Sequence, residues 1–179
     1  GSRALDRSHV GTQAHEPMPQ VSIVIPVFNG LDHTRNCLDA IEQHPPGIPH
    51  EVIVVDNGSS DGTRAFLDGR GGTLRLLTND QNLGFTEACN RGAEAARAPF
   101  LVFLNNDTIP RPGWLEHLLH SAEEEERVGA VGAKLIYPDG RLQEAGGVVL
   151  SDGSTRNFGR GDDPTRADYC RPCEVDYCS

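Results

Sequence analysis

Short apolar runs alternate with amphipathic stretches along most of this 179-residue chain. Four runs predict β-strands, at residues 21–25, 51–55, 73–77 and 100–104. Apolar residues recur at helical spacing after the first, third and fourth runs, over residues 31–41, 84–96 and 114–122. Strands that alternate with helices indicate an α/β domain with a largely parallel sheet flanked by helices.

Two details of this pattern make sharper predictions. Pro26 stops the first run, and the fourth run is apolar throughout, which is typical of a central strand covered on both faces. The helix that begins near Gly84 is amphipathic, so we expect it to bury its apolar face. That face is lined by Phe85, Ala88, Cys89, Ala93 and Ala96.

The pattern changes at both ends of the chain. Residues 1–19 are polar and without period, so we expect a poorly ordered leader whose opening Gly1-Ser2 is a tag remnant. After Val128, the Gly- and Val-rich stretches 128–137 and 141–150 flank a Pro-Asp-Gly turn and predict a β-hairpin.

Charge and hydropathy exclude several classes of partner. The chain has 26 acidic against 16 basic side chains, a formal charge of −10, and no cluster of Lys and Arg. Nucleic acid is not an expected partner, because its phosphates call for clustered cations. No apolar run approaches the roughly 18 residues of a transmembrane helix, and no export signal is present. We therefore expect a location in the cytoplasm, including the cytoplasmic face of the membrane.

The five cysteines predict reduced thiols, because their number is odd and no export signal accompanies them. Cys170, Cys173 and Cys178 have C-x2-C-x4-C spacing, which leaves two interpretations open. They are either part of a zinc site that lacks a fourth ligand at a familiar spacing, or ordinary cysteines near the chain end.

Polar residues follow every predicted strand. In a parallel α/β sheet, ligands bind where the carboxyl ends of the strands meet. A single polar residue there would be a turn or cap residue, but four strand ends that behave alike predict a ligand site at this edge. The residues concerned are Asn29 after the first strand, Asp56 after the second, Asn82 and Gly84 after the third, and Asn105 and Asp107 after the fourth.

The end of the fourth strand predicts a cation site. Side chains alternate along a strand, so Asn105 and Asp107 are expected on the same side. Two oxygen-bearing groups so placed can hold Mg2+ or Mn2+, with phosphate oxygens and waters completing the shell. Such a cation would allow an acidic protein to bind an anionic ligand.

Two common nucleotide-binding motifs are missing from the sequence. It contains no G-x-x-x-x-G-K-[ST], and residues 26–30 (PVFNG) stand where a dinucleotide-binding G-x-G-x-x-G would follow the first strand. A P-loop nucleotide site and an ordinary dinucleotide-dependent oxidoreductase are therefore disfavoured.

Several motifs together resemble family 2 glycosyltransferases. Each is weak alone, but their order from Gln20 onward is specific. They are VSIVIPVFN at 21–29, VVDNGSSDGT at 54–63, NLGF at 82–85, LNNDT at 104–108 and PGWL at 112–115. The later YPDG at 137–140 and QEAGG at 143–147 are similar to the branch with rhamnosyltransferases and other bacterial cell-surface polysaccharide enzymes.

The resemblance implies a GT-A fold with a mixed, mostly parallel sheet flanked by helices. The GT-A domain would occupy residues 20–179, with a nucleotide-binding part at 20–127 and the start of an acceptor-side part at 128–179. Because the family pattern continues further, we expect a C-terminally truncated domain.

The resemblance also implies which residues bind the nucleotide sugar. Asp56 would contact the nucleobase with the segment 26–29 alongside, and the turn at 82–84 would lie by the nucleotide sugar. The residues implied at the nucleotide are Pro26, Val27, Phe28, Asn29, Asp56, Asn82, Gly84 and Asn106.

The family's D-x-D motif, which binds the metal and the diphosphate, corresponds to residues 105–107. Asp107 is the expected ligand of Mn2+ or Mg2+, together with Asn105. Because Asn replaces the first Asp, one negative charge is lost, and we expect weak metal affinity without nucleotide.

The implied reaction is inverting transfer of a sugar from a UDP- or dTDP-linked donor to a glycan or lipid-linked acceptor. A carboxylate base deprotonates the acceptor hydroxyl, and the metal stabilises the departing diphosphate. Family members carry this base after a segment similar to residues 175–179, and neither Glu144 nor Asp176 matches its position. We therefore expect the base to lie outside these residues.

Two alternatives stay open beside the transferase. The first is a binding module that holds nucleotide without transferring sugar. The second is a sugar nucleotidyltransferase, which is disfavoured because the loop at 26–30 has no basic residue.

Overall fold

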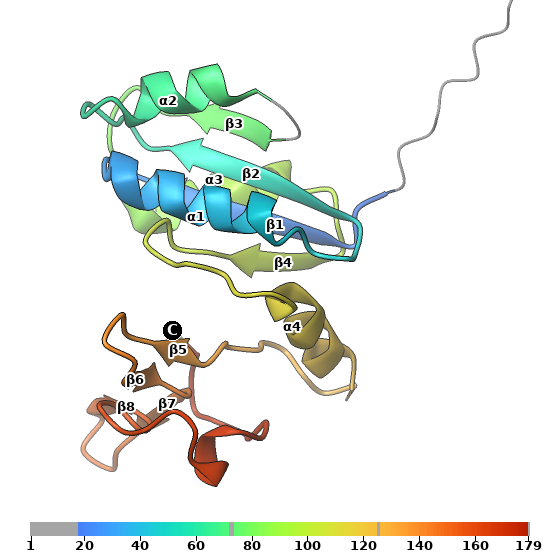
Figure 1. Cartoon of the computed structure of the whole chain (residues 1–179), viewed down its shortest axis with the longest axis vertical. Helices are drawn as coiled ribbons and strands as arrows, with labels where there is room; N and C mark the ends of the chain where they lie inside the picture. Colours follow the sequence, from blue (N-terminus) through green and yellow to red (C-terminus); the bar gives the residue numbers. More distant parts are fainter. Residues whose placement is uncertain (1–17, 72–73, 125, 179) are drawn as a thin grey trace, which may run out of the picture. The chain divides into compact units, whose positions relative to one another are not determined.

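The computed structural model describes residues 18–71, 74–124 and 126–178. The chain forms two compact units (Figure 1). Among the described residues, unit 1 comprises those up to Gly30 and from Pro49 to Asn105, and unit 2 comprises those from Leu31 to Ile48 and from Asn106 onward. All but the last two residues of the expected leader lie outside the described residues.

Unit 1 is built on a parallel four-stranded sheet in the order β3-β2-β1-β4. The two middle strands are buried along almost their whole length. The predicted parallel α/β sheet is therefore confirmed. Its strands are β1 (Val21–Val27), β2 (His50–Asp56), β3 (Leu74–Thr78) and β4 (Phe100–Phe103).

The strand β1 continues through Pro26, so the prediction that it stops there was wrong. Leu104 N donates to Val24 O on the β4 side of β1, and Asn57 N donates to Val27 O on the β2 side. Because hydrogen-bonding groups alternate between the two sides of a strand, Pro26 faces the β4 side. It lies beyond the last residue that pairs with β4, so its missing N–H removes no ladder hydrogen bond.

The strand β4 is not a covered central strand, which corrects a second prediction. Among the described strands it pairs with β1 alone. Leu101 is 42% exposed and Phe103 is 50% exposed. An apolar run thus identified the strand correctly but did not reveal how many neighbours it has.

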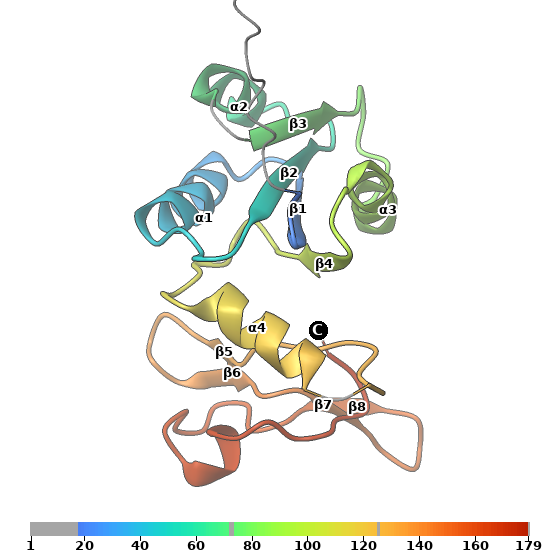
Figure 2. The ribbon, with the colours of Figure 1, turned by 90° about the vertical axis from the view of Figure 1, so that its right-hand side faces the viewer.

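Two helices lie on opposite faces of this sheet, α2 (Thr63–Arg70) and α3 (Phe85–Ala95) (Figure 2). Ala88 of α3 packs against Val24 and Ile53. Gly92 allows a close approach, because a Cβ there would come within 2.2 Å of Val24 Cγ1. The predicted apolar face does not include Phe85, which is 61% exposed.

The helix α2 was not predicted. It has only eight residues, and the glycine at position 69 weakens its helical pattern. One signal of its start was present in the sequence: Asp61 Oδ1 accepts hydrogen bonds from Thr63 N at 3.1 Å and from Thr63 Oγ1 at 2.5 Å. A carboxylate that binds an amide of the first turn stabilises a helix start.

The described part of unit 2 contains two helices, two antiparallel pairs of strands and one short 3-10 helix. The predicted hairpin is confirmed around residues 137–141, where Tyr137 N donates to Arg141 O at 2.8 Å. Its strands are shorter than expected, and the second pair was not predicted. The elements are α1 (Leu31–Gln43), α4 (Trp114–Glu123), β5 (Leu135–Ile136) with β6 (Leu142–Glu144), β7 (Gly147–Val149) with β8 (Thr155–Asn157), and η1 (Ala167–Tyr169).

None of the helices in the described part of the chain is long and apolar enough to cross a membrane.

Candidate functional site

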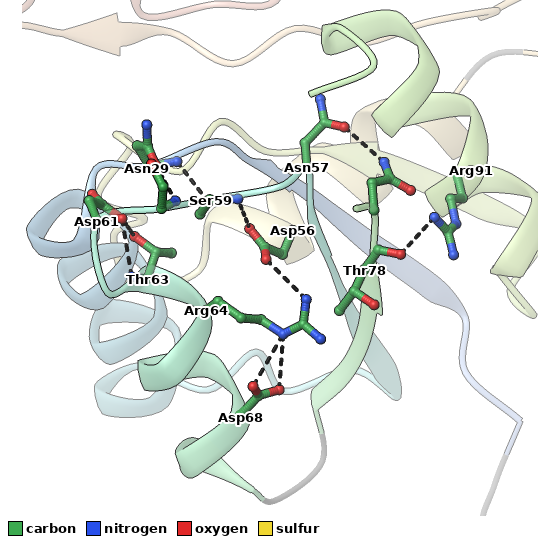
Figure 3. Close-up of polar contacts among 12 residues, drawn as sticks. Asn29, Asp56, Asn57, Ser59, Asp61, Thr63, Arg64, Asp68, Thr78 and Arg91 are labelled. Atoms are coloured by element: carbon green, nitrogen blue, oxygen red, sulfur yellow. Dashed lines mark hydrogen bonds and ion pairs between the residues drawn. The ribbon is translucent and has the colours of Figure 1, made fainter. Parts of the chain in front are cut away.

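The loops that follow β1 and β2 are joined at one edge of the unit 1 sheet (Figure 3). Asn29 N donates to Ser59 Oγ, and Ser60 N donates to Asn29 Oδ1, both at 2.8 Å. Gly30 N donates to Asp61 Oδ2 at 2.7 Å. Asn29 adopts a left-handed conformation with φ +59°, which Asn tolerates better than most residues. Two of the predicted polar strand ends therefore form one bonded loop cluster.

Asp56 is the last residue of β2 and is only 1% exposed. Its Oδ1 accepts a hydrogen bond from Ser59 N at 3.1 Å, and its Oδ2 lies 3.5 Å from Arg64 Nη1. Arg64 Nε in turn lies 3.2 Å from both carboxylate oxygens of Asp68 (Figure 3). Asp56 is thus a buried acceptor whose orientation is set by one amide and one cation.

Asn57 fixes the loop that follows β3. Its Oδ1 accepts hydrogen bonds from Asn79 Nδ2 at 2.8 Å and from Leu83 N at 3.1 Å. Its Nδ2 donates to Asn82 Oδ1 at 2.8 Å and to Gly84 O at 3.1 Å. The whole carboxamide is therefore used to hold residues 79–84 against the end of β2.

This arrangement changes the interpretation of the predicted turn at 82–84. Asn82 Oδ1 also accepts a hydrogen bond from Gly84 N at 2.9 Å, so this oxygen shapes the turn itself. Gly84 has φ +93°, and a Cβ built on it would meet nothing within 4 Å. Its backbone is therefore open to the approach of a ligand.

Sequence reasoning assigned no role to Asn57, Ser59 or Arg64. Asn57 and Ser59 lie inside the motif at 54–63, so the motif carried the signal, but their partners stand far along the chain. Arg64 follows the motif directly and lies on the helix that was not predicted.

The segment before Asn29 divides into two parts. Pro26 and Val27 are buried in β1, whereas Phe28 is 49% exposed. Of these three residues, Phe28 therefore has the side chain that is exposed.

The end of β4 differs from the prediction. Leu104 N still donates to Val24 O, so Asn105 follows β4 at the same edge as the other strand ends of unit 1. However, β4 ends at Phe103, and Asp107 belongs to a turn. The argument that strand alternation places Asn105 and Asp107 on one side was therefore wrong in its premise.

Asn106 and Asp107 both belong to unit 2. Asn106 Nδ2 donates to Thr34 Oγ1 of α1 at 2.9 Å. Asp107 is exposed. Burial, and after it the nearby charge of Asp107, raise the pKa of the Cys37 thiol to about 12.

The residues at 105–107 fit a divalent cation by chemistry, because a carboxylate and an amide oxygen are ligands that Mn2+ and Mg2+ accept. They do not make a complete protein site. Over the described residues, no group of three or more His, Cys, Asp or Glu side chains could hold a metal ion.

The same finding gives no support to zinc at the C-terminal cysteines. Cys170, Cys173 and Cys178 are exposed, Cys37 and Cys89 are buried, and none of the five forms a disulfide within the described residues.

The two carboxylates left without a role in the sequence have structural partners. Glu144 is 3% exposed and its Oε2 accepts a hydrogen bond from Asn157 Nδ2 at 2.8 Å. Asp176 Oδ2 accepts one from Val149 N at 2.8 Å. Both therefore stabilise the strand pairs of unit 2.

Comparison with known proteins decides the family. Residues 22–173 match the family model described as "Glycosyl transferase family 2". The chain belongs to glycosyltransferase family 2. Most of the motifs that carried the resemblance lie inside the matched region, so the predicted family is confirmed.

Curated members of the family are similar over most of this chain. Glycosyltransferase AglE of Haloferax volcanii is 36% identical over 129 residues, which are 69% of this chain and 42% of AglE. The O-antigen biosynthesis protein RfbC of Myxococcus xanthus is 36% identical over 134 residues, which are 73% of this chain and 10% of RfbC. This chain therefore spans less than half the length of these relatives.

Solved structures of glycosyltransferases confirm the predicted GT-A fold. Mannosyltransferase PcManGT from Pyrobaculum calidifontis, in complex with GDP-Man and Mn2+, gives a TM-score of 0.58 at 26% identity over 68% of this chain and 37% of its own. S. aureus TarS 1–349, in complex with UDP-GlcNAc, gives 0.52 at 21% identity over 59% of this chain and 31% of its own. Within the described residues, the four-stranded sheet is parallel, and the two antiparallel pairs form separate two-stranded sheets.

Proposed function

We propose that this chain binds a UDP- or dTDP-linked sugar and serves inverting, metal-assisted transfer of that sugar to a glycan or lipid-linked acceptor. The observation that carries the proposal is the bonded edge of the unit 1 sheet, where Asp56 is buried and oriented. Membership of glycosyltransferase family 2 supports the interpretation of that edge as the donor site. Similarity to the O-antigen biosynthesis protein RfbC supports a role in surface polysaccharide synthesis. The transfer we propose is of a rhamnosyl or hexosyl group, in the cytoplasm or at the cytoplasmic face of the membrane.

Asp56 would recognise the nucleobase. A carboxylate only accepts hydrogen bonds, and uracil and thymine carry one imide N–H between two carbonyl groups. Arg64 keeps a positive charge beside this carboxylate, and Phe28 offers an exposed ring next to Asn29. Asn57 would act indirectly, by holding the turn that contains Asn82 and Gly84 beside the sugar.

Asp107, with Asn105, would hold Mn2+ or Mg2+ together with the donor's diphosphate. The cation would supply positive charge to the diphosphate as it departs. The complex of PcManGT with GDP-Man and Mn2+ supports this choice of metal. Asp107 alone contributes one negative charge, so its carboxylate binds the cation weakly until the nucleotide adds its oxygens.

The base that deprotonates the acceptor hydroxyl is assigned to none of the described carboxylates. The acidic motif that carries it in the family has no match among the 179 residues. We therefore expect these residues alone to bind donor without turnover. A module that only binds nucleotide would behave in the same way until the missing motif is supplied.

Calorimetric titration of the chain with UDP or dTDP in the presence of Mn2+ tests the donor site. We expect binding, and we expect Asp107→Ala to weaken it at least tenfold because the cation loses its charged ligand. Glu174→Ala is the matched control, since this exposed carboxylate lies elsewhere in unit 2. Absence of binding with Mn2+ or Mg2+ present would refute the donor-site proposal, and preference for GDP would correct the donor class.

A further inference from the structure

An open hollow of about 680 Å3 lies in unit 2 over β8 and the turn that follows it. Two arginines, Arg156 and Arg160, contribute to its lining, together with Asn157 and Asp162. None of these residues belongs to the nucleotide or metal site described above.

The two arginines differ from most others in this acidic chain. Arg64, Arg75 and Arg97 all form ion pairs with carboxylates of unit 1. Arg156 and Arg160 form no ion pair or hydrogen bond through their side chains within the described residues. The lining of the hollow therefore includes two arginines without a counter-ion from the described residues.

The carboxylate in the lining does not neutralise them. Asp162 accepts hydrogen bonds from Asp163 N and Tyr169 Oη, each at 2.9 Å, and lies 3.1 Å from Arg166 Nη1. The amide of Asp163 and then the Tyr169 hydroxyl lower the pKa of Asp162. Its cationic partner is thus Arg166, outside the hollow lining, which also lies 3.2 Å from Asp168 Oδ2.

The backbone between the arginines is held in place. Asn157 donates to Glu144 Oε2 at 2.8 Å and accepts from Tyr177 Oη at 3.2 Å. Gly159 has φ +76°, and a Cβ there would come within 2.5 Å of Leu142 Cδ2. The turn is therefore packed on its inner side, and these contacts hold the backbone from which the two arginines extend.

We propose that this hollow binds the phosphate or diphosphate group of the acceptor. The inference rests on the proposed function, because it assigns a chemical class to the acceptor of that reaction. Guanidinium groups bind phosphate oxygens with paired hydrogen bonds, and the hollow is open enough to admit a phosphate group. The donor's diphosphate is assigned to the cation at Asp107, so a second anion at Arg156 and Arg160 is the acceptor's.

The test compares two double variants of the full 179-residue chain. Arg156→Gln with Arg160→Gln removes the two arginines of the hollow. Arg127→Gln with Arg171→Gln removes the same charge from two exposed arginines outside it. Each protein is titrated with inorganic pyrophosphate, with a prenyl diphosphate in detergent, and with UDP plus Mn2+, and thermal melting checks that each variant is folded.

We expect the variant at Arg156 and Arg160 to lose pyrophosphate and prenyl diphosphate affinity at least tenfold. The control variant should stay within about twofold of the original chain on both probes. Affinity for UDP with Mn2+ should be unchanged in both variants, which keeps this result separate from the outcome for Asp107→Ala.

Two results would overturn the inference. Equal pyrophosphate affinity in the two double variants would show that the arginines bind no phosphate. If the variant at Arg156 and Arg160 lost as much affinity for UDP as for pyrophosphate, the hollow would serve the donor and not the acceptor.

Discussion

Glu51 is a buried carboxylate near the start of β2, at the opposite end of that strand from Asp56. It accepts hydrogen bonds from Ser22 Oγ at 2.7 Å, Arg97 N at 2.8 Å, Arg97 Nε at 3.0 Å and Arg75 Nη1 at 3.3 Å. Burial alone would raise the pKa of Glu51, but these hydrogen bonds, first that from Ser22, outweigh burial and lower it. Its ionised form therefore stabilises the folded state.

Glu51→Gln should lower the free energy of unfolding by about 2 kcal/mol at pH 7, because a charged acceptor of several donors is lost. A lowered folded-state pKa means that this contribution is present above the unfolded pKa near 4.5 and is lost as pH falls through the folded value. The difference between the two proteins should therefore shrink in acid. Urea titrations at neutral and acidic pH measure it, with the exposed Glu94→Gln as control. A difference that does not change with pH would contradict this account.

At the scale of elements, the turn after β2 presses against the loop after β3. Gly58 has φ +80°, and a Cβ on it would stand 2.7 Å from the carbonyl carbon and Cα of Gln81. Gly153, in the turn between β7 and β8, has nearly the same φ, +82°, but nothing lies within 4 Å of its Cβ position. Substitution of Gly153 therefore measures the free-energy cost of a left-handed backbone alone, whereas substitution of Gly58 adds the cost of a steric clash.

Gly153→Ala should lower the free energy of unfolding by about 1–2 kcal/mol, the cost of a side chain in the left-handed region. Gly58→Ala should lower it by at least about 2 kcal/mol more, because the loop at 79–84 must move away. The same movement should weaken binding of a UDP-sugar with Mn2+, which Gly153→Ala leaves unchanged. Equal destabilisation by both substitutions, measured by urea titration, would show that the two loops are not in contact.

The elements that sequence analysis found and missed follow from local information. β1, β2, β3 and α3 carry dense apolar patterns and were predicted. α2 is short and contains a glycine, and β8 reads Thr-Arg-Asn, so neither has a periodic apolar pattern. The edge position of β4 depends on its neighbours in space, which its own residues do not encode.

At the scale of the whole molecule, the sequence predicted those site residues whose position follows from the end of a single strand. Asn29, Asp56 and Gly84 stand at strand ends along the chain, and unit 1 brings these ends to one edge. Asn57 and Arg64 were missed because their roles depend on partners that the sequence does not place beside them. The relation of Asp107 to that edge stays a prediction from the family motif.

Net charge acts on every ligand of this chain, because −10 is spread over only 179 residues. A nucleotide diphosphate without metal is repelled by this charge at long range, whereas pyrophosphate at the proposed site would meet the positive charges of Arg156 and Arg160 directly. Salt screens long-range repulsion and short-range attraction alike. The two proposed anion sites should therefore respond to salt with opposite signs.

Titration without divalent metal, at about 10 mM and about 150 mM salt, tests this. In the variant Arg156→Gln with Arg160→Gln, where only the donor site is left, UDP affinity should rise about threefold with salt as repulsion is screened. In the original chain, pyrophosphate affinity should fall by a similar factor. Adding Mn2+ should make UDP binding tighter and nearly independent of salt, because the cation offsets the charge of the diphosphate. If metal-free UDP affinity instead fell with salt in that variant, protein cations would be meeting the diphosphate, and a metal at Asp107 would not be needed to explain donor binding.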